Sequence, residues 1–276
     1  MKTKKITRIV VYLLLVLSIG AFLFPVYWMV ISSFKNNSAL ISWPPSFSPV
    51  FSNLDNYITI FGNTKYLTYF KNSLITSGGA VVISLFVSVL AAYAFSRFRF
   101  RFKNLLMTSL MNIQVFPVTV IVISLFTFYT KLGLQSTYQG LILAELVYSL
   151  PFTVWFLKAF MDTVPFSLDE AARIDGCNSW QCFSRIILPL TLPGIASTSI
   201  YAFITSWNEY MFAFILTSRP EMKTLSVGIA EMNGFQQIRW NDMMAASLMA
   251  SLPLILLFIC LQKYFVSGLT SGAVKS

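Results

Sequence analysis

The chain of 276 residues is 56% hydrophobic and only 11% charged, whereas soluble domains carry roughly 25% charged residues. This composition excludes an ordinary soluble protein and indicates that a lipid bilayer surrounds most of the chain. The net charge of +10 does not indicate nucleic-acid binding, because the basic residues are divided among short clusters between apolar runs. The sequence therefore predicts an all-α membrane protein.

The apolar runs predict six transmembrane helices, since about 20 mostly apolar residues cross a bilayer. In chain order these runs are 9–34, 72–96, 104–130, 132–157, 186–218 and 243–262. The first run follows several basic residues, but it is too long for a signal peptide and no small-x-small cleavage site follows it. We expect it to remain as the first span.

Charge bias predicts that both termini are cytoplasmic, because Lys and Arg are enriched in cytoplasmic loops. With the N-terminus inside, the inner basic residues outnumber the outer ones. The inner set is Lys2, Lys4, Lys5, Arg8, Arg97, Arg99, Arg101, Lys103, Lys158, Arg173, Arg185, Lys263 and Lys275. The outer set is Lys35, Lys65, Lys71, Lys131, Arg219, Lys223 and Arg239.

This topology divides the chain into three parts. Residues 1–71 comprise the first span and an outer loop, and residues 72–266 form a core of five spans. Residues 267–276 form a polar C-terminal tail. The segment 158–186 lies between two spans of the core and faces the cytoplasm.

The segment 158–186 carries signals for a helix, a turn and a second helix. Ser167–Glu170 fits a capping box, so that a helix over 168–175 is predicted. Gly176 suits the left-handed position that ends a helix, and Asn178–Gln181 offers a second capping signal. A simple connector between spans does not need these devices. We therefore interpret the segment as a docking element for a soluble partner, with a mere connector as the alternative.

Two acidic residues, Glu145 and Glu209, lie within the predicted spans, where a carboxylate is costly and suggests a function. Both are predicted in the outer half of the membrane. Aromatic and amide side chains next to Glu209 suit a sugar, whose hydroxyls need acceptors and whose ring face packs on aromatic groups. The alternative is a structural hydrogen bond between helices or to a partner subunit. The candidate pathway residues are Glu145, Trp207, Asn208, Glu209 and Tyr210.

Catalysis within this chain is not expected. The sequence contains no histidine, so Ser-His-Asp and Cys-His catalysis are absent. The dipeptide Gly-Lys does not occur, which excludes a GxxxxGK[ST] phosphate-binding loop. The three cysteines form no CxxC pair, and we predict neither a disulfide framework nor a metal site. If ATP drives this protein, a partner subunit binds the ATP and Mg²⁺.

A longer pattern resembles a known family. Glu170-Ala171-Ala172, Gly176 and Ile186-x-Leu188-Pro189 match the EAA signature of permease subunits in bacterial ABC importers. The rest of the chain is similar to the second permease subunit of maltose-type, multiple-sugar importers. The further matching pieces are Ser33-Phe34-Lys35, Asn56-Tyr57, Asn72-Ser73-Leu74, Ala91 to Arg97, Leu150-Pro151-Phe152, Ala171 to Gly176, Ser206 to Tyr210 and Val266 to Lys275.

The resemblance implies a type I importer permease in the bacterial inner membrane that works with several partners. These are a second, homologous permease, two ATPase subunits and an extracytoplasmic sugar-binding protein. By the same resemblance the EAA segment is a coupling helix seated in a cleft of the ATPase, and the C-terminal tail reaches toward that interface. The coupling residues would be Glu170, Ala171, Ala172, Asp175 and Gly176, and the loop that probes the binding protein would contain Gly234, Phe235, Gln236 and Gln237.

Three other functions remain as alternatives. One is an importer of glycerol phosphate or another small polar solute. The phosphate anion would need a cation in the pathway, and no predicted span contains Lys or Arg. An ion-coupled secondary transporter would show internal repeats and broken helices at the midplane. A channel or assembly scaffold would keep its function without the cytoplasmic helix. The sequence shows no clear internal repeat, and a secondary transporter would leave the EAA segment unexplained.

Overall fold

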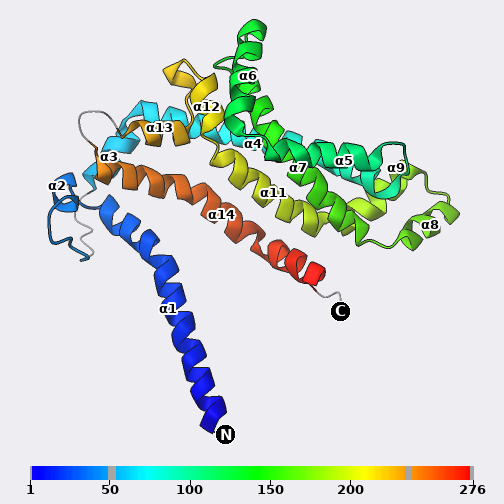
Figure 1. Cartoon of the computed structure of the whole chain (residues 1–276), viewed down its shortest axis with the longest axis horizontal. Helices are drawn as coiled ribbons and strands as arrows, with labels where there is room; N and C mark the ends of the chain where they lie inside the picture. Colours follow the sequence, from blue (N-terminus) through cyan, green and yellow to red (C-terminus); the bar gives the residue numbers. More distant parts are fainter. Residues whose placement is uncertain (1, 49–53, 234–237, 274–276) are drawn as a thin grey trace. The chain divides into compact units, whose positions relative to one another are not determined.

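The computed structural model describes residues 2–48, 54–233 and 238–273, and this part of the chain contains helices and no strand. Figure 1 shows the helices in chain order. Four continuous helices are long and apolar enough to cross a membrane, and two bent pairs bring the number to six if each pair counts as one span. The continuous spans are Thr7–Ser33, Thr64–Arg97, Tyr138–Asp162 and Trp240–Lys263.

The two bent pairs lie in runs 104–130 and 186–218, each of which is predicted to form one span. Helix α5 (Lys103–Asn112) and the short turn after it meet α6 (Val118–Leu132) at 98°. Pro117 stands immediately before α6, where it cannot donate a helical hydrogen bond. A second bend of 71° separates Ser179–Leu190 from Leu192–Trp207. The sequence pattern located both apolar runs but did not reveal that each is divided.

The chain forms two compact units, of which the smaller contains Met1–Leu67 and Ile229–Leu252. It comprises α1 (Lys2–Ser33), α2 (Asn37–Leu40), α3 (Asp55–Gly62) and the first part of α14 (Trp240–Ala273). The amide of Asn56 holds this unit together: it donates to the carbonyl oxygens of Ser33 and Lys35 at 2.8 and 3.0 Å and accepts from Asn241 at 2.6 Å. Most large side chains of α1 are exposed, as expected for a helix in lipid.

The larger unit contains Thr68–Gly228 and Pro253–Ser276. Its main helices are α4 (Thr64–Arg97), α7 (Tyr138–Asp162) and α11 (Leu192–Trp207). Small polar residues allow α4 and α7 to pack closely, and the hydroxyls of Ser84 and Ser88 lie 3.2 and 2.6 Å from that of Thr153. These contacts hold the two helices close together.

Polar contacts fix both ends of the α4–α7 pair. At the C-terminal ends Ser96 donates to Asp162 at 2.7 Å. At the other end the hydroxyl of Tyr138 donates to Asn72 at 2.7 Å, and the Asn72 amide donates to the carbonyl oxygens of Glu221 and Lys223. The two helices therefore run in the same direction. The segments that follow them, 98–102 and 163–178, lie at the same end of this unit.

Candidate functional site

The predicted docking segment folds as a short helix, a glycine turn and a second short helix. Helix α8 (Phe166–Ile174) has nine residues and begins after Pro165. It ends in a Schellman arrangement: Gly176 N–H donates to the carbonyl oxygen of Arg173 at 3.1 Å and Cys177 N–H to that of Ala172 at 2.9 Å. Gly176 has φ +85°, which confirms its predicted left-handed conformation.

The predicted capping box at Ser167 is wrong. The residue that precedes α8 is Pro165, and no side chain caps the helix there. Proline fixes the backbone at that position, so the helix starts earlier than predicted and Ser167 lies within its first turn. The second capping signal is confirmed, because Asn178 and Gln181 each accept a hydrogen bond from the other's backbone N–H at 2.9 Å. They begin α9 (Ser179–Cys182).

Helix α8 has one buried face and one exposed face. Asp169 and Ala172 are three positions apart and are buried against the chain's own core, with exposed fractions of 7% and 3%. The remaining predicted coupling residues, Glu170, Ala171, Asp175 and Gly176, are exposed. Ala172 therefore lies away from the face that a partner would meet. Its small side chain instead lets α8 approach the helices beneath it.

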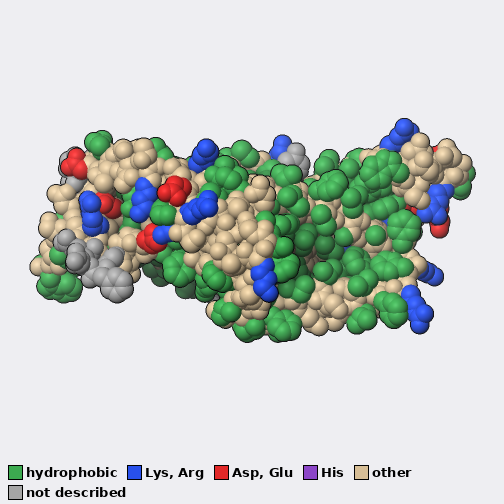
Figure 2. Space-filling model, turned by 90° about the horizontal axis from the view of Figure 1, so that it is seen from above, with side chains coloured by type: hydrophobic (Ala, Val, Ile, Leu, Met, Phe, Trp, Pro, Cys, Tyr) green, Lys and Arg blue, Asp and Glu red, His purple; other side chains and the backbone are tan. Residues whose placement is uncertain are grey.

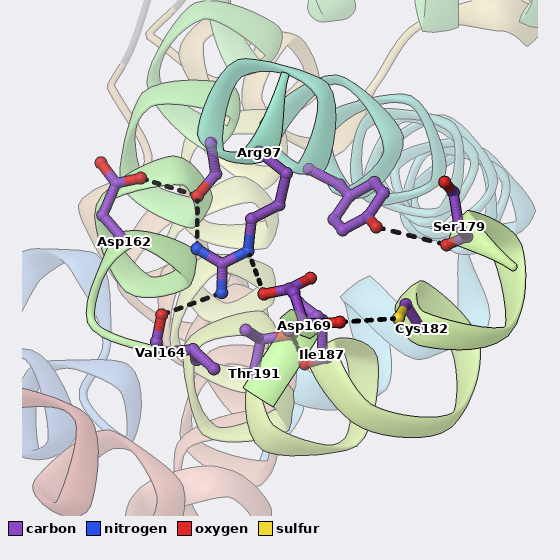
Figure 3. A network of polar contacts seen from close by, with 10 residues as sticks. Arg97, Asp162, Val164, Asp169, Ser179, Cys182, Ile187 and Thr191 are labelled. Atoms are coloured by element: carbon purple, nitrogen blue, oxygen red, sulfur yellow. Dashed lines mark hydrogen bonds and ion pairs between the residues drawn. The ribbon is translucent and has the colours of Figure 1, made fainter. Parts of the chain in front are cut away.

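An ion pair holds the buried face of α8. Arg97, the last residue of α4, places its Nε 2.9 Å from Oδ2 of Asp169, and both side chains are at least nine-tenths buried. Figure 3 shows the guanidinium group pointing into the space between α4 and α8. The two residues belong to distant parts of the sequence. The pair therefore links the end of α4 directly to α8.

The other nitrogen atoms of Arg97 make further contacts. One donates to the carbonyl oxygen of Val164 at 2.9 Å and another to the hydroxyl of Ser96 at 3.3 Å (Figure 3). The ring of Phe166 lies against the guanidinium group, with 4.5 Å between the guanidinium carbon and the ring centroid. Arg97 thus contacts α8 at its first residue and in its middle, and it also binds the segment just before the helix. We call Arg97 and Asp169 with these partners the clasp.

Sequence reasoning did not identify the clasp. The sequence places Arg97 among the basic residues that indicate the topology and shows no partner for Asp169. A signal was present in the spacing of Asp169 and Ala172, which marks one narrow face of α8. The partner of an acidic residue on such a face must come from elsewhere in the chain, and the sequence does not show which cation supplies it.

Helix α9 connects the docking helix to α11. The hydroxyl of Tyr93 on α4 donates to the carbonyl oxygen of Ser179 at 3.2 Å (Figure 3). The buried thiol of Cys182 lies 3.8 Å from the backbone carbonyl oxygen of Asp169. A π-helical turn, Phe183–Ile187, follows α9 without interruption. Beneath these elements lies a cluster of apolar residues: Ala92, Tyr93, Leu157, Met161, Val164, Phe183 and Ile187.

The outer surface of this segment is amphipathic. Ile174 and Trp180 are 86% and 65% exposed, and they accompany the exposed charges of Glu170 and Arg173. Figure 2 shows, on one face of the molecule, broad areas of hydrophobic side chains with the charged side chains in small separate groups. Large exposed apolar groups next to charges are typical of a surface that binds another protein.

The candidate pathway residues lie around a break between α11 and α12 (Met211–Leu216). Glu209 occupies this break and caps α12, because its two carboxylate oxygens accept from the backbone N–H groups of Phe212 and Ala213 at 2.7 and 3.0 Å. Asn208 and Tyr210 on either side are exposed. The helix in the predicted run 186–218 therefore ends at Trp207, and the Glu209 carboxylate caps the next helix, α12.

Glu145 and Trp207 are buried within the larger unit. Glu145 on α7 lies beside the hydroxyls of Thr76 and Ser206, and Glu209 is near enough for the two carboxyl groups to interact. The Trp207 ring is stacked with that of Phe203 at 5.5 Å. The structure thus brings both acidic residues to one region of the larger unit. The predicted binding-protein loop, Gly234–Gln237, lies outside the described residues.

Comparison with known proteins gives a consistent result. Residues 84–271 match the family described as the inner membrane component of binding-protein-dependent transport systems. A trehalose/maltose transport system permease protein from Thermococcus litoralis is 35% identical over 278 residues, which cover 100% of this chain and 99% of the relative. A diacetylchitobiose uptake system permease protein from Streptomyces coelicolor is 36% identical, with 94% of each chain covered.

A solved structure shares the fold. A chain from a bacterial ABC transporter that imports the polysaccharide alginate superposes with a TM-score of 0.81 at 22% identity, over 96% of this chain and 98% of that one. The family match covers residues 84–271, and the similar relatives extend over nearly the whole sequence. The chain belongs to the inner membrane components of binding-protein-dependent transport systems and is a multi-pass membrane permease subunit.

Proposed function

We propose that this permease serves an ATP-driven importer of sugars and forms half of its translocation pathway together with a second, homologous permease. The single observation that carries the ATP-driven mechanism is the clasped helix α8, whose exposed face offers Glu170 to a soluble partner while Asp169 anchors it to α4. Similarity over the whole chain to a trehalose/maltose permease supports a sugar as the cargo.

We further propose six spans with both termini in the cytoplasm, counting each bent pair as one span. The charge bias of the loops supports this orientation. The parallel α4 and α7 also support it, because the loops that follow them lie at one end of the larger unit. The proposed parts remain residues 1–71, the core 72–266 and the tail 267–276. Helix α14 extends through the first residues of that tail, to Ala273.

Coupling is proposed to pass through α8 to two ATPase subunits that bind ATP and Mg²⁺, so that this chain carries out no hydrolysis itself. The exposed Glu170, Ala171, Asp175 and Gly176 would touch the ATPase. Ala172 would contribute by letting α8 lie close to its own core. When the ATPase pair closes, α8 would move as one body with the ends of α4 and α11, which changes the side on which the pathway opens.

The sugar pathway is proposed to pass the break between α11 and α12. Asn208 and Tyr210 are exposed there and combine an amide with an aromatic ring. Glu209 would hold these residues in place by capping α12, with Glu145 and Trp207 behind them. The loop containing Gly234–Gln237 is proposed to meet an extracytoplasmic sugar-binding protein.

Reconstitution tests the importer function directly. The chain is assembled in liposomes with its partner permease and ATPase, and candidate binding proteins are added with and without their sugars. We expect one sugar-loaded binding protein to stimulate ATP hydrolysis and sugar uptake together. Uptake that proceeds without ATP, or without any binding protein, would contradict the proposal.

The variant Glu170→Lys tests the docking face. Because Glu170 is exposed, we expect the variant to fold normally but to lose co-purification of the ATPase and most transport. The matched control is Glu221→Lys, an exposed charge reversal at the opposite end of the same unit. It should retain the ATPase fully. Normal transport by Glu170→Lys would show that α8 is only a connector.

A double-mutant cycle tests the clasp. Arg97→Met or Asp169→Leu alone leaves one buried charge unpaired, and we expect each to lower the free energy of unfolding by about 3–5 kcal/mol. The double variant should lose clearly less than the sum. The control Lys158→Met breaks a more exposed pair with Asp162 and should cost less than about 1 kcal/mol. Additive losses in the cycle would mean that Arg97 and Asp169 do not act together.

Two variants distinguish positioning from sugar contact at the helix break. Glu209→Gln removes one acceptor from the cap, so we expect a lower melting temperature with unchanged sugar selectivity. Tyr210→Ala should keep the melting temperature and raise the KM for sugar uptake. If Glu209→Gln changes which sugar is imported, the carboxylate itself contacts the cargo. If Tyr210→Ala leaves KM unchanged, the pathway does not pass this break.

A further inference from the structure

A turn of alternating basic and aromatic residues joins α4 to α5. From Arg97 to Lys103 the sequence reads Arg-Phe-Arg-Phe-Arg-Phe-Lys. Both flanking helices are part of candidate membrane spans. The residues between them, 98–102, reach at most about 18 Å when fully extended. The turn is therefore confined to the membrane surface.

The aromatic side chains of this turn pack against α4 and remain partly exposed. Phe98 meets Tyr93 edge to face, with ring centroids 5.7 Å apart, and Phe100 lies 5.6 Å from Phe95. Phe102 is 59% exposed and has the left-handed φ of 66°, which turns the chain into α5. Partly exposed rings anchored in this way suit the boundary between lipid and water.

The cations of the turn are not neutralised by the chain. Arg97 belongs to the clasp, but within the described residues no carboxylate forms an ion pair with Arg99, Arg101 or Lys103. The Lys103 ammonium donates to the carbonyl oxygen of Phe98 at 3.2 Å, which stabilises the turn. Arg101 lies over the ring of Phe102, 5.0 Å from its centroid. Arg99 and Lys103 therefore remain as two cations without a carboxylate partner among the described residues, and they attract an anion.

The same turn forms a shallow hollow of about 340 Å³. Its wall contains Arg99, Phe100, Phe102, Lys103, Asn104 and Leu105. The first N–H groups of α5 lie at this place and have no side-chain cap, since Phe102 precedes the helix. The hollow thus combines two cationic side chains, helix N–H donors and apolar surface. Such donors hold a phosphate group.

We propose that this hollow binds the headgroup of an anionic phospholipid. Arg99 and Lys103 would contact the phosphate. Phe102 and Leu105 would lie along the part of the acyl chains that is nearest to the headgroup. A lipid is favoured over a soluble anion because both flanking helices enter the bilayer and the wall is partly apolar. The site is separate from α8 and from the break that contains Glu209, so it does not depend on the proposed sugar transport.

Native mass spectrometry of the assembled transporter tests this site. Phosphatidylglycerol and phosphatidylcholine are supplied in equal amounts, and the retained lipids are counted for each variant. We expect Arg99→Gln and Lys103→Gln each to reduce retained phosphatidylglycerol about fivefold, the effect of losing one basic contact near an anionic surface. Phosphatidylcholine should not change. Because Lys103 also stabilises the turn, Arg99→Gln, which removes an exposed side chain, is the decisive variant.

Two controls remove one positive charge elsewhere. Arg101→Gln lies on the same turn outside the wall of the hollow, and Lys131→Gln lies at the end of α6. Both should retain phosphatidylglycerol as the unmodified chain does. The proposal is overturned if Arg99→Gln matches these controls. It is also overturned if millimolar inorganic phosphate displaces the lipid completely, because the site would then select a soluble anion.

Discussion

The ion pair between Arg97 and Asp169 is the contact on which the position of helix α8 in this permease depends. A helix of nine residues is too short to be stable in water without tertiary contacts. Here a guanidinium group from a membrane span reaches the buried face of α8 and also binds the carbonyl oxygen of Val164 just before it. The short helix consequently has one defined position relative to α4.

Two separate connections lead from α8 into the membrane. Arg97 is the last residue of α4, and α9 continues through the π-helical turn Phe183–Ile187 toward α11. The apolar cluster around Met161 and Phe183 fills the space between these routes. A force applied to the exposed face of α8 therefore acts on two spans through packed atoms. Such contiguous packing is the physical requirement for transmitting a change in a partner's state.

The sequence predicted those features that depend on neighbouring residues. Apolar runs located the four continuous spans and the two bent helix pairs, Gly176 marked the end of α8, and Asn178–Gln181 marked the start of α9. The errors arose where a distant group or a competing local effect decided the outcome. Pro165 moved the start of α8 away from Ser167, and the partner of Asp169 came from the end of α4. Glu209 is a comparable case, since its effect on α12 depends on how the chain turns there.

The π-helical turn has a consequence for how this segment tolerates changes of length. A π turn accommodates one residue more than an α-helical turn, and each residue of an α-helix rotates the chain by about 100°. Deleting one residue within Phe183–Ile187 would regularise the helix locally, yet it would also rotate everything before it relative to α11. Asp169 would then face away from Arg97. The number of residues between α8 and α11 is therefore more strictly constrained than the identity of the exposed residues between them.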